Sequence, residues 1–118
     1  MKKELKLVEE FHKKFKVPVL NEPSLISKKR AEFRFKLMKD EVEEYFEGVK
    51  SGDLENVPKE LADILYAVYG TILEHGLQGK IEEIFEENHR SQMSKEYNQY
   101  KMVKGKESFE ADVKKCLQ

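Results

Sequence analysis

The chain has 118 residues, enough for one ordinary domain, and 38% of them are Asp, Glu, Lys or Arg. Its net charge of −1 gives no reason to expect binding to nucleic acid or to a membrane surface. A single cysteine, Cys116, excludes a disulfide framework, and the N-terminal segment has no apolar signal-peptide core, so we expect a soluble cytoplasmic protein.

Four helical patterns follow one another along the chain, and no alternating pattern long enough for a strand accompanies them. Ser27 is a good N-cap for the second pattern, and Gly76 is expected to end the third. The expected helices cover residues 2–16, 27–51, 58–75 and 80–97, with a short extra helix between residues 109 and 117. These patterns predict an all-α fold, a four-helix bundle with a short C-terminal extension, formed by residues 1–118 as one domain.

The first expected helix carries a polar residue on its apolar face. Leu5, Val8, Phe11 and Phe15 share this face with His12. A histidine in such a position is more often a core or pocket-edge residue than a metal ligand, and we count His12 as a candidate substrate-binding residue.

The third expected helix has an acidic residue within its most apolar part. Between Leu61 and Leu73 the only charged residue is Asp63, and a helix that is apolar on nearly all sides is a buried helix. An ionised carboxylate there is costly unless something compensates it. Glu60 lies one turn earlier on the same side. Acidic residues at a helix start also complement the helix dipole, which explains Glu60, just after Pro58, better than Asp63.

A second acidic pair lies on the preceding helix. The apolar face of that helix is expected to consist of Ala31, Phe35, Met38, Val42, Tyr45, Phe46 and Val49. Glu41 borders this face and Glu44 follows one turn later. The connection to the third helix is short, so the two helices should be antiparallel neighbours that bring Glu41 and Glu44 opposite Glu60 and Asp63. Two carboxylates about 5 Å apart repel by roughly 3 kcal/mol, so the cluster predicts a hard cation such as Mg²⁺ or Mn²⁺.

The fourth expected helix has a polar residue at a core position. Its expected inner face consists of Ile81, Ile84, Phe85, Asn88 and Gln92, with Ser91 and Lys95 on the same side. Asn88 can either hydrogen-bond within the core or reach a bound metal or ligand. Arg90 lies on the opposite side of the helix and should be exposed.

The two acidic pairs fit the pattern ExxE, from Glu41 to Glu44, followed by ExxD, from Glu60 to Asp63. The chain also contains FHKKF near its start, NHRSQMSK at residues 88–95, and KG and ADV further on. With these segments it resembles the MazG-like all-α nucleoside triphosphate pyrophosphohydrolases, a group that includes phosphoribosyl-ATP pyrophosphohydrolase-like proteins. The similarity covers most of the chain.

The resemblance implies a set of site residues and a reaction. The implied Mg²⁺ ligands, which Mn²⁺ could also use, are Glu41, Glu44, Glu60 and Asp63. Asp40 would orient a water or a second ion, and Asn88 and Lys95 would contact the phosphate or sugar of the substrate. The implied reaction cleaves a nucleoside triphosphate or related nucleotide between the α- and β-phosphates, giving the monophosphate and pyrophosphate. Glu44 or Glu41 could act as general base, and the sequence leaves the base, the sugar and the number of ions open.

A second copy of the chain is expected for two reasons. The resemblance implies a homodimer, or a dimer of dimers, with sites near the subunit interface. Independently, a chain of 118 residues buries only a modest fraction of its surface, and the helix at 58–75 needs neighbours on almost every side.

Two other classes of protein compete with this interpretation. A di-iron carboxylate bundle uses Glu-x-x-His on two helices, and the chain contains Glu9-x-x-His12 and Glu86-x-x-His89. The helical wheel argues against this class because Glu9, Glu86 and His89 do not lie on the inner faces. A non-catalytic helical interaction module is the other alternative, but it leaves Asp63 and Asn88 without a role.

Overall fold

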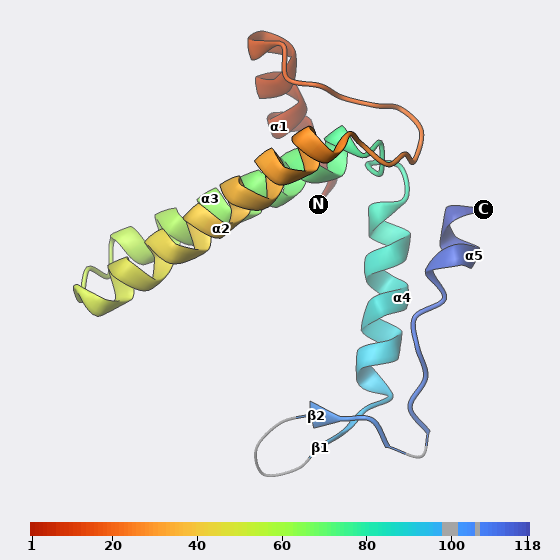
Figure 1. The fold of residues 1–118 in the computed structure, drawn as a ribbon. Coiled ribbons are helices and arrows are strands. Elements are labelled where there is room, and N and C mark those ends of the chain that lie inside the picture. Colours follow the sequence, from red (N-terminus) through yellow and green to blue (C-terminus); the bar gives the residue numbers. More distant parts are fainter. Residues whose placement is uncertain (98–101, 106) are drawn as a thin grey trace. The chain divides into compact units, whose positions relative to one another are not determined.

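The computed structural model describes residues 1–97, 102–105 and 107–118, which form five helices and one pair of very short strands (Figure 1). The helices are α1 (Lys2–Phe15), α2 (Lys28–Lys50), α3 (Asn56–Glu74), α4 (Ile81–Met93) and α5 (Val113–Leu117). The strands β1 (Glu96–Tyr97) and β2 (Met102–Val103) pair antiparallel, with Glu96 opposite Val103. The expectation of an all-α fold is confirmed. None of the helices in the described ranges is long and apolar enough to cross a bilayer.

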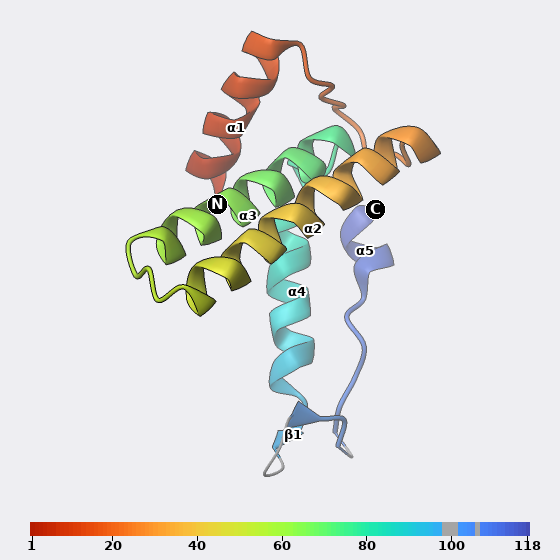
Figure 2. The same cartoon turned by 60° about the vertical axis from the view of Figure 1, so that its left-hand side comes forward.

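The chain divides into two compact units, residues 1–78 with α1 to α3 and residues 79–118 with α4, the strands and α5. In the first unit, α2 and α3 lie side by side as an antiparallel hairpin, and α1 packs against α3 (Figures 1 and 2). The hairpin follows from the short connection after Lys50. This is the arrangement expected for the two acidic pairs.

The boundaries of the helices in the first unit have clear local causes. The Ser27 side chain accepts a hydrogen bond from the backbone N–H of Arg30 at 3.2 Å, which confirms its role as N-cap. At the end of α3, Gly76 adopts a left-handed backbone with φ 68°, as expected for the residue after a helix. A Cβ atom at Gly76 would lie 2.1 Å from the Glu22 carbonyl oxygen, so this position also needs glycine for space.

The connection between α1 and α2 is fastened to the end of α3. The backbone N–H of Leu20 donates to the carbonyl of Leu73 at 3.0 Å, and that of Ser24 donates to the carbonyl of His75 at 2.9 Å. The Gln78 side-chain amide donates to the carbonyl of Leu20 at 2.7 Å. A connection without regular structure thereby satisfies its own backbone and that of the helix end.

Only part of the expected apolar face of α2 meets α3, where the Thr71 hydroxyl lies 3.9 Å from Met38 Sδ. Arg34 and Gly48 are the buried residues of α2, and Glu41 and Tyr45 are half-buried between them. On the expected core face Phe35, Val42, Phe46 and Val49 are all exposed, Phe46 by 57%. Leu61 and Leu65 of α3 are exposed as well. A single chain therefore leaves part of α3 exposed, and the expectation that a second copy covers it stays a prediction.

The second unit also departs from expectation. The helix α4 ends at Met93 rather than at residue 97, because the backbone N–H groups of Ser94 and Lys95 turn back to the carbonyls of Ser91 and Gln92. Ser91 is buried, and its hydroxyl donates to the carbonyl of Phe109. The side of α4 that meets the C-terminal segment thus carries Ser91, which the sequence also places on the inner side. On the expected inner face Asn88 is exposed, so its placement at a core position is wrong within this unit.

Candidate metal centre

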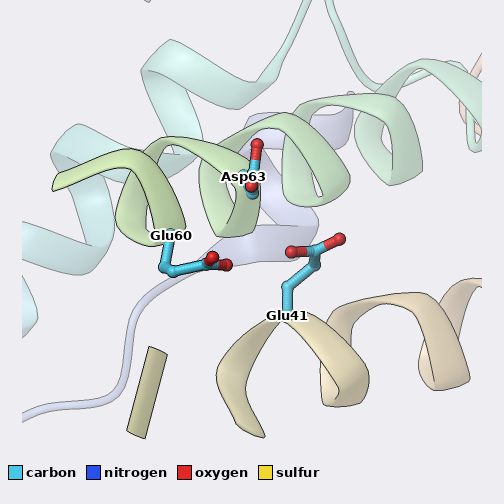
Figure 3. A group of neighbouring side chains, drawn as sticks. All are labelled: Glu41, Glu60 and Asp63. Carbon is cyan, nitrogen blue, oxygen red and sulfur yellow. The ribbon is translucent and has the colours of Figure 1, made fainter. Parts of the chain in front are cut away.

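Three carboxylates from the hairpin of α2 and α3 come together. Glu41 extends from α2, and Glu60 and Asp63 project from neighbouring turns of α3 (Figure 3). One oxygen from each lies within 4.8 Å of the others. In the ranges that the structure describes, this is the only group of three or more Asp, Glu, His or Cys residues with the spacing of a metal site. All three residues are among those that the sequence predicts as metal ligands.

The electrostatics of this carboxylate cluster favour a bound positive charge. Burial raises the pKa of Glu60, whose side chain is only 6% exposed, and the neighbouring Glu44 raises it further. Burial likewise raises the pKa of Glu41, with added repulsion from Glu44 and Asp63. The Oε2 atoms of Glu41 and Glu60 are buried without a hydrogen-bond partner among the described residues. Unpaired carboxylate oxygens of this kind fit a hard cation, which would supply the missing partner.

The exposure of the two α3 carboxylates is the reverse of what the sequence suggested. Asp63 is 37% exposed, and its Oδ2 atom lies 2.8 Å from Lys59 Nζ, one helical turn earlier. Glu60 is the buried member. Asp63, whose burial was expected to be costly, therefore has the ammonium group of Lys59 nearby. Glu60, which the helix dipole seemed to explain, is the residue whose buried oxygen lacks a hydrogen-bond donor among the described residues. Glu44 is exposed and lies beside the cluster but outside the group of three, and Asp40 is exposed on α2.

A pocket of about 230 Å³ adjoins the cluster and shares Glu41 and Asp63 with it. Its lining includes three aromatic side chains, Phe11, Phe33 and Tyr66, and two polar ones, His12 and Arg34. We call it the aromatic pocket. Phe11 packs edge-on against Tyr66, with ring centroids 5.5 Å apart. The pocket places an apolar, ring-lined space directly next to the carboxylates, an arrangement that suits a ligand with an aromatic part and an anionic part held through a cation.

The described geometry agrees with the comparison to known families. A family model for phosphoribosyl-ATP pyrophosphohydrolase matches residues 8–92. This chain belongs to the phosphoribosyl-ATP pyrophosphohydrolase family. Membership makes it a pyrophosphohydrolase that acts on a nucleotide, and the family suggests the use of a divalent metal. The match takes in all four expected metal ligands and ends before Lys95. A comparison with the curated proteins found no match.

Behind the pocket of this pyrophosphohydrolase lies a buried ion-pair network that sequence reasoning missed. Glu74 accepts hydrogen bonds from Arg34 Nε and from Arg30 Nη2, the latter at 3.0 Å. Burial would raise the pKa of Glu74, but the bonds from both arginines outweigh it and hold that pKa below its ordinary value. Glu74 is an acidic residue in the last turn of a helix, where it opposes the dipole. That unfavourable placement is the sequence signal that could have revealed a cationic partner.

His12 joins the same network. Its ring is buried, with Nδ1 3.1 Å from the carbonyl of Pro18 and Nε2 3.4 Å from Arg34 Nη2. One neutral tautomer satisfies both contacts, with Nδ1–H as donor and Nε2 as acceptor. Burial lowers the pKa of His12, and the charge of Arg34 lowers it further. His12 thus lines the pocket, as expected of a pocket-edge histidine, and holds Arg34.

The remaining candidate residues belong to the second unit of the chain. Asn88 is exposed on α4, and Lys95 follows that helix. Arg90 is exposed as expected, with its guanidinium paired to Glu87 at 2.7 Å and 4.2 Å from the centre of the Phe109 ring. The roles of Asn88 and Lys95 in substrate binding stay predictions.

Proposed function

We propose that this chain is a Mg²⁺-dependent enzyme that hydrolyses a nucleoside triphosphate, or a related nucleotide, between its α- and β-phosphates. The products would be the nucleoside monophosphate and pyrophosphate. The observation that carries the proposal is the carboxylate cluster, in which two buried oxygens lack a partner among the described residues, beside a pocket lined with aromatic rings. Family membership supports the same reaction type.

The residues that would hold the ion are Glu41, Glu60 and Asp63, with Glu44 close enough to complete the set. Mn²⁺ offers the same preference for carboxylate oxygens and is the expected substitute. When bound, the ion would neutralise charge on the phosphates and favour attack by water. Glu60 and Glu41 would anchor it from the buried side, since their unpaired oxygens gain most from a cation.

Proton removal from the attacking water falls to a carboxylate that is not fully engaged with the ion. Of the two candidates, Glu44 is exposed and lies outside the group of three, whereas Glu41 belongs to it. We assign the general base to Glu44. It would take the proton as the water oxygen bonds to phosphorus. The bond between that phosphorus and the bridging oxygen of the anhydride would break, and the bridging oxygen would leave on the other of the two products. Asp40 would orient that water from the same helix.

A second copy of the chain is part of the proposal. The exposed apolar side chains of α2 and α3, notably Phe35, Val42, Phe46 and Leu65, form surfaces that a single chain leaves in water. A homodimer, or a dimer of dimers, would cover them. Asn88 and Lys95 are proposed to contact the phosphate or sugar of the nucleotide.

The test is a panel of nucleotides incubated with the purified protein and Mg²⁺, with pyrophosphate and orthophosphate detected separately. Release of pyrophosphate with an equal amount of monophosphate, abolished by chelation and by Glu44→Gln, is the expected result. Orthophosphate as the first product would place the cut at the wrong anhydride and contradict the proposal. Absence of any product across the panel would favour a non-catalytic module instead.

A further inference from the structure

Arg34 is the hydrogen-bond donor in the part of the aromatic pocket away from the carboxylate cluster, since the N–H of its polar neighbour His12 is directed to the Pro18 carbonyl. Arg34 is nearly inaccessible to water yet lines the pocket together with His12. The carboxylates that line it, Glu41 and Asp63, belong to the carboxylate cluster, where a cation would engage them. A ligand in the pocket therefore meets the carboxylates of Glu41 and Asp63 on one side, and the guanidinium of Arg34 in the part of the pocket away from the cluster.

The guanidinium of Arg34 is fixed in position with donors to spare. Its Nε–H bonds Glu74 and one N–H of Nη2 points to His12 Nε2. Among the described contacts these use two of its five N–H groups. Gly70 leaves it room, because a Cβ atom there would lie 2.7 Å from Arg34 Nη1. A buried donor held in this way discriminates strongly, since a ligand that offers it no acceptor leaves it unpaired.

We propose that the aromatic pocket is the base-recognition subsite of the enzyme, and that Arg34 selects bases with a carbonyl oxygen over counterparts with an amino group at the same position. The inference rests on the proposed function, because it takes the ligand to be a nucleotide. The rings of Phe11, Phe33 and Tyr66 would pack against the base, and its phosphates would lie toward Glu41 and Asp63. Arg34 then meets an edge of the base, where an oxygen can accept its N–H and an amino group cannot.

The test compares two pairs of nucleotides that differ by oxygen against amino group, UTP with CTP and ITP with ATP. The expected result is a kcat/KM at least roughly tenfold higher for the oxo member of each pair, the effect of one charged hydrogen bond. Equal kcat/KM within both pairs, or preference for the amino members, overturns the proposal while leaving the hydrolysis itself intact.

A variant that removes the Arg34 guanidinium must not leave the buried Glu74 carboxylate without its charged partner. Arg34→Met combined with Glu74→Gln removes both charges together, and the new side-chain amide keeps an acceptor oxygen for Arg30. This double variant should lose the preference to within about threefold, through a higher KM for the oxo substrate rather than a lower kcat. The matched control is Arg30→Met, which also removes a partner of Glu74 but does not line the pocket. It should keep the preference.

Binding of the reaction products separates this proposal from the proposed function. Calorimetric titration with UMP and CMP measures the subsite without hydrolysis. If no nucleotide releases pyrophosphate, yet UMP binds more tightly than CMP and the double variant loses this difference, the subsite stands and the reaction is wrong. If neither monophosphate binds, or both bind equally, the subsite is wrong.

Discussion

The carboxylate of Glu74 and the guanidinium of Arg34 form an ion pair in which both side chains are shut away from water, with 1% and 5% of their surfaces exposed. A buried pair of this kind costs desolvation, and removing one partner leaves the other charge uncompensated. The pair joins the last turn of α3 to the first half of α2. It lies directly behind the aromatic pocket.

Glu74→Gln should therefore destabilise the protein by roughly 3–5 kcal/mol. The double variant with Arg34→Met should recover much of that loss, because it removes the stranded charge. Chemical denaturation of the wild type, the two single variants and the double variant gives the coupling energy. A single variant as stable as the wild type would show that the pair is not buried in solution.

Gly70→Ala should weaken the same region by a different route. The added methyl group would lie 2.7 Å from Arg34 Nη1 and 2.9 Å from His12 Nε2, so one of these side chains has to move. We expect a loss of roughly 1–3 kcal/mol in stability, the usual cost of overpacking. Gly79→Ala is the control, since a Cβ atom there meets nothing within 4 Å. Equal stability of the two variants would contradict the close approach.

Asp63→Asn tests the metal assignment. The change removes one charge from a repelling cluster and breaks an exposed pair with Lys59, so the metal-free protein should be about as stable as before. The rise in melting temperature on adding Mg²⁺ should shrink or vanish, because only binding to the native state produces it. Pyrophosphate release should fall roughly 100-fold or more.

Lys59→Met is the matched control for that variant. It breaks the same ion pair and leaves all the carboxylates in place. The response to Mg²⁺ should survive. An Asp63→Asn protein that still responds fully to Mg²⁺ would remove Asp63 from the site.

The raised pKa values of Glu41 and Glu60, caused first by burial, predict a pH dependence with a definite sign. Between the ordinary value of 4.5 and the raised values, the metal-free native state holds more protons than the unfolded chain. The stability that these carboxyls contribute is therefore present below pH 4.5 and is lost as pH rises through the raised values. Mg²⁺ must displace the same protons, so its affinity should increase with pH over that window.

Melting temperatures measured with and without Mg²⁺ between about pH 5 and 8 check both trends. His12 acts in the opposite sense, since burial lowers its pKa and its contribution is lost as pH falls below the ordinary value of 6.5. Comparison with Glu60→Gln isolates the part that belongs to Glu60. An Mg²⁺ response that is the same across the range would contradict the raised pKa values.

The exposed apolar surface predicts that the protein is larger than one chain in solution. Light scattering at micromolar concentration should give at least twice the chain mass of 13.9 kDa. Phe46→Glu should lower the measured mass, because it places a charge in the apolar stripe of α2 formed by the exposed side chains of Phe35, Val42, Phe46 and Val49. Leu25→Glu should not, although Leu25 is even more exposed, because it lies in the connection outside that stripe. A wild-type chain that stays at 13.9 kDa would refute the expected homodimer.

The fold and the carboxylate cluster were largely predictable because they depend on local spacing. Helix periodicity, the Ser27 cap and the short α2–α3 connection are properties of neighbouring residues, and together they place Glu41 opposite Glu60 and Asp63. Spacing along a helix fixes which residues share a side. It does not fix how deep each one lies, so the expected order of exposure of Glu60 and Asp63 is reversed.

The pocket and its network were not predictable for a physical reason. Arg34 and Glu74 are 40 residues apart, and their pairing depends on how α2 is rotated against α3. A helical wheel of α2 favours the side of Phe35 and Phe46, since those residues are apolar. The chain also turns Arg34 toward α3, where it pairs with the buried Glu74 at the end of that helix.

The carboxylates of the proposed metal centre differ in exposure, so the centre has one end closed to solvent and one end open to it. Glu60 lies at the closed end, while Glu44 and Asp63 are open to solvent. If the cluster binds an ion, the ion would meet Glu44 and Asp63 first and would lose its remaining water last, at Glu60. The outer carboxylates would then control how fast the ion is captured, and the inner one would control how long it stays. Exchange of the ion should be slow to complete even where its first encounter with the protein is fast.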